Sequence, residues 1–271
     1  MSPSRTIPSR VALTLALGRA EAVARLRHLS CRMMRLLMRF RSSPFTPDGI
    51  ETIVVLSPHQ DDETLGCGGT VASLARAGIR VQIVFVTDGS ASHPGHLRVS
   101  PQNLSDMRRA EAGEAASILG VDPSCLTYLG FKDGTMAHLD ESTSGLAVEA
   151  IRKVIRDKGP HLVLLPCRMD GSSEHLAVTH LLARALAGEK QKPRVLEFPV
   201  WAWRNPLRLM QPLLAGVKLW RVDLAGLADL KARAISSYAT QVSPLSPDTE
   251  PALPRDFVSE LSRPEEFFFE P

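Results

Sequence analysis

Short apolar runs alternate with stretches of helical spacing through most of the chain. Five runs have the β-branched or leucine-rich composition of strands and end at turn residues: 52–56 (TIVVL), 81–87 (VQIVFVT), 126–129, 161–166 (HLVLLP) and 194–198. Between them, 70–77, 104–119 and 146–158 have the spacing of helices. This alternation predicts βαβ units, and therefore an α/β fold of three layers with a mostly parallel central sheet flanked by helices.

Length and composition fit one enzyme-sized domain with appendages. The chain has 271 residues, of which 44% are hydrophobic and 23% charged, as is ordinary for a globular protein. A formal net charge of +3 is too small to indicate a nucleic-acid partner. The four cysteines lie far apart without a C-x-x-C motif, which argues against a disulfide scaffold and against a cysteine zinc site. We therefore expect a cytoplasmic protein.

The first fifty residues form a separate, basic region with nine arginines against Glu21 and Asp48. Apolar residues recur with helical spacing over 17–40, as in an amphipathic helix. Such a helix either packs its apolar face on the domain, which is the simpler expectation, or makes peripheral contact with an anionic membrane. With the proline-containing linker that follows, we expect a helical extension and linker at 1–48 and one domain at 49–271.

The segment 57–69, SPHQDDETLGCGG, directly follows the first strand-like run. Polar groups there are costly unless they are solvated, paired or bound to a cation. His59 and Asp62 could both reach one Zn²⁺ from a strand-to-helix turn, and Asp61 would stay free as a base. The residues leave open an alternative in which Asp61 or Asp62 only caps the next helix. The glycines that follow would allow a tight turn and close approach of the backbone.

A second polar loop, CRMDGSSEHLAVTH from Cys167, follows the run 161–166. Ligands of parallel sheets bind beyond the carboxyl ends of the strands, so the two loops are expected at one edge of the sheet. His175, at the start of the next apolar helix, is the expected third metal ligand. We expect Asp170 to orient this histidine or the loop itself, and Glu174 to stabilise the start of the helix.

Together these segments resemble the PIG-L/LmbE family of zinc-dependent N-acetylglucosaminyl de-N-acetylases. VFVTDGS (84–90), RRAEAGEAASILG (108–120) and YLGFKDG (128–134) agree with that family as well. The resemblance implies a Rossmann-like fold and Zn²⁺, or another divalent metal such as Fe²⁺, held by His59, Asp62 and His175. It also implies that metal-activated water, with Asp61 as general base, removes the acetyl group from an N-acetylglucosamine-type sugar conjugate.

One departure from the family pattern matters for the chemistry. The second motif usually reads His-x-Asp-His, whereas residues 172–175 are Ser-Ser-Glu-His. The hydroxyl of Ser172 can donate a hydrogen bond to an oxyanion but cannot act as a cationic acid at neutral pH. Either Asp61 carries the proton in both directions, or one of the loop histidines His93 and His96 substitutes.

Three residues are expected to bind the substrate: Arg108, Asp133 and Ser172. An ion pair with Glu111 is the alternative for Arg108, and a turn-forming role is expected of Asp133 in any case. The expected partner is a small-molecule or lipid-linked amino sugar, with no nucleic acid. The competing functions are a catalytically silent carbohydrate-binding protein of the same fold, motivated by Ser172, and another metal-dependent hydrolase.

Beyond residue 200 the sequence predicts only an outline. Trp201 and Trp203 would stack on a sugar ring or pack at the edge of the core. The proline-rich segment 243–256 reads as an extended excursion. The phenylalanines of EEFFFEP (265–271) are expected to cover the sheet or a partner.

Overall fold

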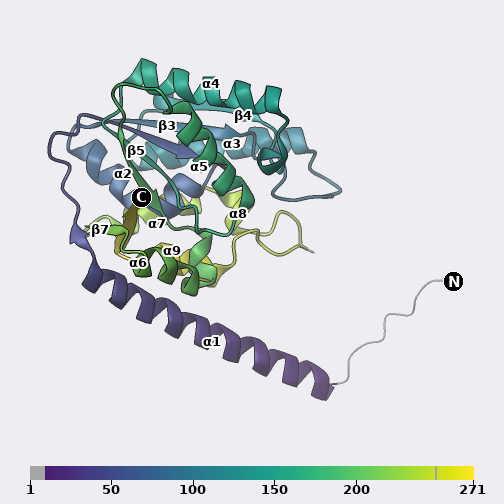
Figure 1. Ribbon diagram of the computed structural model, residues 1–271. Helices are drawn as coiled ribbons and strands as arrows, with labels where there is room; N and C mark the ends of the chain where they lie inside the picture. The colour runs from purple at the N-terminus through teal and green to yellow at the C-terminus, as the bar shows by residue number, and fades with distance from the viewer. Residues whose placement is uncertain (1–9, 248) are drawn as a thin grey trace.

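In the residues that the computed structural model describes, 10–247 and 249–271, one sheet of eight strands lies at the centre of three layers (Figure 1). The strands are β1 (Ser43–Pro44), β2 (Thr52–Ser57), β3 (Arg80–Thr87), β4 (Leu126–Phe131), β5 (Leu162–Pro166), β6 (Arg194–Phe198), β7 (Lys218–Asp223) and β8 (Glu265–Glu270). Their order across the sheet is β1-β7-β8-β6-β5-β2-β3-β4. The predicted α/β fold is confirmed.

Helices cover both faces of this sheet. They are α1 (Arg10–Arg41), α2 (Asp62–Arg76), α3 (Pro101–Ile118), α4 (Glu141–Lys158), α5 (Ser173–Ala185), α6 (Met210–Leu214), α7 (Ala228–Ser236), α8 (Ala239–Val242) and α9 (Arg255–Leu261). Short 3₁₀ helices are η1 (Pro123–Cys125), η2 (Met136–His138), η3 (Trp201–Arg204) and η4 (Pro206–Leu209). Alternate side chains of β2 enter different cores: Ile53 and Val55 lie in the core that α2 and α3 cover, and Val54 and Leu56 pack under α4 and α5.

The five predicted strands all form and pair in parallel from β6 to β4. The expectation for the C-terminal phenylalanines was wrong. They form β8, which enters the sheet antiparallel to both β6 and β7. Phe267, Phe268 and Phe269 are buried on its two faces, so this segment is part of the sheet and not a cover over it.

The glycines of the first motif lie inside α2, which begins eight residues before the predicted helix, so the expected tight turn is wrong there. Close approach is confirmed, because a Cβ at Gly66 would meet the Phe198 ring at 2.0 Å and one at Gly69 would meet Leu224 at 2.4 Å. The helix bends at Cys67, whose φ and ψ are −140° and 18°. The small residues therefore allow the helix to press against the sheet.

After the bend in α2, two backbone N–H groups donate hydrogen bonds to a side chain of a strand. Glu266 of β8 accepts hydrogen bonds from the N–H groups of Gly69 (2.9 Å) and Thr70 (2.7 Å). The Nζ atom of Lys231, on α7, lies 2.8 Å from the same carboxylate, and both side chains are 2% exposed. The buried ion pair thus fastens α2 to the last strand and to α7.

The N-terminal helix packs one face on the body of the molecule. Cys31, Met34 and Met38 of α1 are buried, and α1 contacts η4 and β7. In the segment expected as a linker, β1 adds two residues to the edge of the sheet beside β7. Residues 1–9 of the expected extension lie outside the described residues. None of the helices in the described part of the chain has the length and apolar character needed to cross a bilayer.

Candidate metal centre

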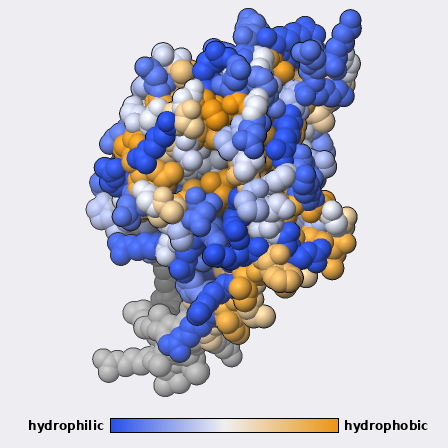
Figure 2. All heavy atoms as spheres, turned by 90° about the vertical axis from the view of Figure 1, so that its left-hand side faces the viewer, coloured by the Kyte–Doolittle hydropathy of each residue, from blue (hydrophilic) through white to orange (hydrophobic). Residues whose placement is uncertain are grey.

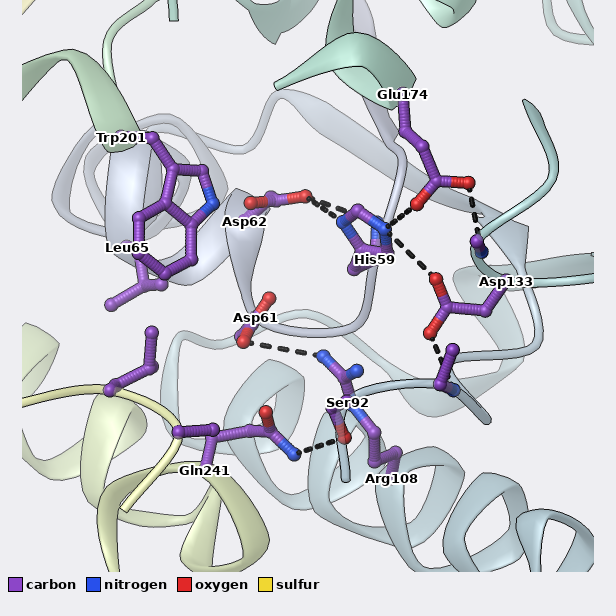
Figure 3. Close-up of a pocket in the computed structure, with 14 residues that line it drawn as sticks. His59, Asp61, Asp62, Leu65, Ser92, Arg108, Asp133, Glu174, Trp201 and Gln241 are labelled. Carbon is purple, nitrogen blue, oxygen red and sulfur yellow. Dashed lines mark hydrogen bonds and ion pairs between the residues drawn. The ribbon is translucent and has the colours of Figure 1, made fainter. Parts of the chain in front are cut away.

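Polar side chains gather at the carboxyl ends of the central strands (Figure 3). His59, Asp61 and Asp62 follow β2, and Glu174 and His175 open α5 after β5. Because β2 and β5 are parallel neighbours in the sheet, the two motifs meet at one edge. Asp133, after β4, and Arg108, from α3, complete the group.

His59, Asp62 and His175 come together as the sequence predicted. His59 Nδ1 lies 3.1 Å and His175 Nε2 3.2 Å from Asp62 Oδ2, and one ligand atom from each residue lies within 4.8 Å of the others. The Nε2 atom of His175 is buried and, despite its short distance to Asp62, makes no hydrogen bond. Two imidazoles and a carboxylate are the ligand set of many catalytic zinc sites, and a cation would satisfy this nitrogen.

Each histidine also has its other ring nitrogen held by carboxylate. His175 Nδ1 lies 2.7 Å from Asp170 Oδ2, which is the orienting contact that the sequence predicted. His59 Nε2 lies 2.8 Å from Glu174 Oε2 and 3.2 Å from Asp133 Oδ1. Carboxylates in these positions fix the tautomer of a ligating imidazole, so that the nitrogen facing the metal carries the lone pair.

His59, Asp133 and Glu174 form a second group of possible ligands, which shares its histidine with the first. His59 cannot use Nε2 both to bind a metal and to donate its proton to these carboxylates. The first group is the better metal centre, since it supplies two imidazoles, and the second group then orients one of them.

The ionisation of these residues shows that the site attracts positive charge. Burial lowers the pKa of His175, but the carboxylates of Asp62 and Asp170 outweigh burial and raise that pKa to about 9. At His59 the carboxylates of Asp133, Asp62 and Glu174 likewise overcome burial, and its pKa is well above the usual value. A divalent cation would meet the same electrostatic demand that protons meet on these imidazoles.

Asp61 lies beside His59, Asp62 and His175, which we call the metal group because they are candidate ligands. The backbone conformation of Asp61 is unusual. Its φ is 151°, the one positive value among non-glycine residues in the described parts of the chain. The turn is held by Glu63, whose carboxylate accepts from the Asp61 N–H (3.1 Å) and from the hydroxyls of Ser57 and Tyr238. Strain of this kind persists where surrounding bonds enforce it.

The carboxylate of Asp61 faces a buried guanidinium. Arg108 Nη2 lies 3.2 Å from Asp61 Oδ2 and donates to the carbonyl oxygen of Gln60 at 2.7 Å. Burial raises the pKa of Asp61 to about 7, against the opposing effect of Arg108. The alternative for Arg108, an ion pair with Glu111, is replaced by this contact with Asp61, and Glu111 instead accepts from the N–H and hydroxyl of Thr240 at 2.7 Å.

The comparisons with known proteins decide the family. The family model of PIG-L, described as GlcNAc-PI de-N-acetylase, matches residues 54–186, which include both motifs. Residues 54–186 belong to the PIG-L family. The resemblance predicted from the sequence is therefore confirmed.

Known relatives of this PIG-L domain include deacetylases. The chain is 26% identical over 205 residues to 2'-N-acetylparomamine deacetylase of Streptomyces fradiae, covering 69% of this chain and 72% of that protein. The solved N,N'-diacetylchitobiose deacetylase from Pyrococcus horikoshii matches with a TM-score of 0.57 and 21% identity over 76% of each chain. GalB, the 4-carboxy-2-hydroxymuconate hydratase of Pseudomonas putida, matches with a TM-score of 0.57 and 22% identity over 79% and 83% of the chains. The likeness to the two structures shows the fold alone, so the reaction has to be argued from the site.

A cavity of about 360 Å³ opens beside the metal group of the PIG-L domain. One wall is polar and includes Asp133, Arg108 and Ser92, while Leu65 and Trp201 stand on the opposite side (Figure 3). The Trp201 ring stacks on Phe257 with centroids 4.8 Å apart. Trp203 packs in the core at 4% exposure, which is one of the two predicted roles, whereas stacking on a sugar ring stays a prediction for Trp201.

Ser172 serves as the N-cap of α5. Its Oγ accepts a hydrogen bond from the N–H of His175 at 3.3 Å, and it is not among the described residues that line the cavity. His93 and His96 line a different hollow, next to Ser246 and Thr249. The structure therefore brings none of these three side chains to the cavity wall in the described residues, whereas Arg108 and Asp133 both reach it.

Sequence reasoning missed the contacts of Glu174 and Glu63. Glu174 was expected only to stabilise its helix, yet it holds His59 and accepts from the N–H groups of Gly134 (3.0 Å) and Met136 (3.1 Å). The available signal was its place directly before a predicted ligand. Nothing in the sequence paired Glu63 with Tyr238, which comes from a segment 175 residues away.

Proposed function

We propose that this PIG-L domain is a zinc-dependent hydrolase that removes the acetyl group from an N-acetylglucosamine-type sugar conjugate. The observation that carries the proposal is the grouping of His59, Asp62 and His175 around a buried nitrogen without a hydrogen bond, with Asp61 next to it at the wall of a cavity. The amino-sugar deacetylase among the relatives supports this choice of substrate class. A cytoplasmic location remains part of the proposal.

His59, Asp62 and His175 would hold the metal, and two imidazoles with one carboxylate are a ligand set of catalytic zinc sites that Fe²⁺ also accepts. Bound there, the metal would supply Lewis acidity that polarises a carbonyl group and acidifies water. The protein contributes fixed ligands, because Asp170 and the pair Glu174 and Asp133 orient the two imidazoles.

Asp61 is the proposed general base. Its carboxylate lines the cavity, and a pKa near 7 allows it to take a proton from water and to return one to the departing amine. Arg108, 3.2 Å away, favours the ionised form that accepts the proton. Because His93 and His96 line a separate hollow, we infer that Asp61 carries the proton in both directions.

The two walls of the cavity fit an acetylated amino sugar. Asp133 and Arg108 offer an acceptor and a donor for sugar hydroxyl groups on one side. Leu65 and Trp201 offer apolar surface near Asp62 on the other, where the methyl group of an acetamide would be desolvated.

Acetate release by the zinc-loaded protein tests the proposal. The panel would contain free, nucleotide-linked and lipid-linked N-acetylglucosamine, with metal content measured alongside. We expect release that stops on chelation and returns with zinc. Asp61→Asn should lower kcat by about 10²- to 10⁴-fold while metal content stays the same, and Asp106→Asn, at an exposed position on α3, is the matched control.

Ser172 motivates the second candidate, a carbohydrate-binding protein of this fold without turnover. Ser172→His would restore the first histidine of the family's second motif, three residues before His175. A rise in kcat in this variant would support a deacetylase that works without the usual helper acid. One equivalent of zinc and tight sugar binding without acetate release, in both proteins, would favour the silent binding protein.

A further inference from the structure

Gln241 carries a buried amide at the wall of the cavity beside the metal group. The residue lies on α8, is 2% exposed, and lines the cavity together with Asp61 and Arg108. The match to the PIG-L family ends at residue 186, so the match assigns no role to this residue. The reaction proposed above does not use it either.

Two hydroxyl groups hold the NH₂ group of Gln241. Its Nε2 atom donates to Oγ1 of Thr240 at 2.8 Å and to Oγ of Ser92 at 3.2 Å. The Thr240 hydroxyl has one proton, which it donates to Glu111 at 2.7 Å, so toward Gln241 this oxygen can only accept. The nitrogen of the amide therefore faces Thr240, and the oxygen points away from it.

The amide oxygen of Gln241 is left for a ligand. Within the described part of the chain Oε1 accepts no hydrogen bond, and it is not among the enclosed polar atoms that lack a partner. Figure 3 shows Nε2 turned to Ser92 and Oε1 on the side of Asp61. Because the residue is almost fully buried and lines the cavity, this oxygen opens into the cavity. A buried acceptor of this kind requires a donor from water or from a ligand.

The surrounding backbone keeps this amide in place. The N–H of Leu253 donates to the carbonyl oxygen of Gln241 at 2.8 Å, and the N–H of Gln241 donates to that of Tyr238 at 2.8 Å. The Tyr238 hydroxyl donates to Glu63, which also holds the turn at Asp61. The acceptor is thus fixed relative to the proposed base, and little order has to be gained when a ligand binds.

We propose that Gln241 selects the substrate by accepting a hydrogen bond from one hydroxyl group of the sugar ring. The inference rests on the proposed function and adds a specificity-determining residue to it. An amide oxygen can only accept, so it pairs with a hydroxyl donor. An analogue without that hydroxyl would leave the oxygen unsatisfied in the complex and would be rejected.

An N-acetylated amino sugar has two kinds of donor, the ring hydroxyls and the N–H of the acetamide. In the proposed reaction Asp61 returns a proton to the departing nitrogen, so that nitrogen has to face Asp61. A ring hydroxyl is then the donor left for Gln241. Asp133 and Arg108, on the polar wall, are available to the other hydroxyls.

Deoxy analogues of the sugar test the inference. The probes are N-acetylglucosamine and its 3-, 4- and 6-deoxy analogues, assayed with zinc-loaded protein for acetate release and, by NMR titration, for binding. For one analogue kcat/KM of the unchanged chain should fall at least about tenfold. Gln241→Met, with similar length but no oxygen, should lose as much on N-acetylglucosamine itself and should not distinguish that analogue from it.

The matched control is Gln191→Met. Gln191 is exposed and lines a hollow around 159–161 and 188–193, directly before β5 and β6, whereas the metal group lies where the parallel strands end. Figure 2 looks onto the side of the molecule where the parallel strands begin, and hydrophilic and hydrophobic residues are interspersed there. The control should discriminate among the analogues as the unchanged chain does.

Thr240→Val leaves Gln241 in place but removes the hydroxyl that orients its amide. This variant should lose part of the same discrimination, and it tests the inference if Gln241→Met does not fold. Equal discrimination by the unchanged chain and Gln241→Met, in turnover and in binding, would overturn the inference while leaving the deacetylase intact. If the unchanged chain released no acetate from any probe, the result would speak against the proposed function instead, and the binding titrations would still decide the role of Gln241.

Discussion

The two histidines of the metal group are held in different ways. His175 is fully buried, and one carboxylate, Asp170, holds its Nδ1 atom. His59 is 17% exposed at its side chain, and two carboxylates, Glu174 and Asp133, hold its Nε2 atom. The tautomer of His175 therefore depends on one contact, whereas that of His59 has a second partner if the first is lost.

The carboxylates themselves are fixed by backbone. The Oδ1 atom of Asp170 accepts from the N–H groups of Val200 (2.8 Å) and Ala202 (2.7 Å). Two N–H groups of the 134–136 turn hold Glu174 in the same manner. Each orienting group thus has one oxygen committed to the fold and one to a histidine, which lets amide substitutions test the histidine contact selectively.

Removal of the buried ligand should have the largest effect. His175→Gln is expected to abolish zinc binding, because Gln has no imidazole nitrogen and the remaining His59 and Asp62 are too few for a tetrahedral site. Metal analysis after dialysis would measure it. His180→Gln, an exposed change on the same helix, is the control and should keep one equivalent of zinc. Full zinc content in His175→Gln would remove this residue from the ligand set.

Asp170→Asn should come next, with zinc affinity about 100-fold lower, at the upper end of the range for such partners. The backbone N–H groups hold the side-chain oxygen, so the new NH₂ group faces His175 Nδ1 and can only donate. The imidazole then carries its proton on Nε2, where it cannot bind a metal. Competition with a chelator would measure the affinity, and an unchanged value would show that the contact does not set the tautomer.

Glu174→Gln should cost less, about tenfold in zinc affinity, because Asp133 still accepts from His59. Asp133→Asn should have a similar effect. The double variant should approach the loss seen in Asp170→Asn, since neither acceptor remains. If the single and double variants were alike, the idea of two interchangeable partners would fail, and the two histidines would be held alike.

Ser172→Ala should have the smallest effect on the metal. Loss of the N-cap of α5 should lower the free energy of unfolding by about 1 kcal/mol, measured by denaturant titration. Zinc affinity should stay the same, because the carboxylate contacts of His175 are untouched. A large fall in affinity would instead mean that the cap positions the ligand.

The sequence predicted the sheet from β2 to β6 and the residues that meet at its edge, because both depend on local patterns. Strand-like runs and helical spacing are visible within ten residues, and parallel strands end at one edge. The contact of His59 with two carboxylates could not be predicted in the same way. It needs Asp133, from the loop after β4, and Glu174, from the first turn of α5, to converge, and only the packing of α5 against the 134–136 turn brings them together.

The last strands were missed for a related reason. In EEFFFEP the phenylalanines are consecutive, so period-two alternation gives no signal, and burial on both faces of β8 came from its place between β6 and β7. Glu266, within that strand, satisfies the bent α2 through contacts almost two hundred residues away along the chain. Partners at such distance leave no mark in a local pattern.

The glycines of the first motif have a further consequence. Gly66 and Gly69 are required by the close approach of Phe198 and Leu224, so these positions answer to steric fit and not to chemistry. A descendant of this chain that lost His59 or Asp61 would still need both glycines to fold. A sequence search that scores the whole segment will therefore find inactive chains together with active ones. Only the residues whose side chains supply nitrogen or oxygen ligands distinguish active chains from inactive ones.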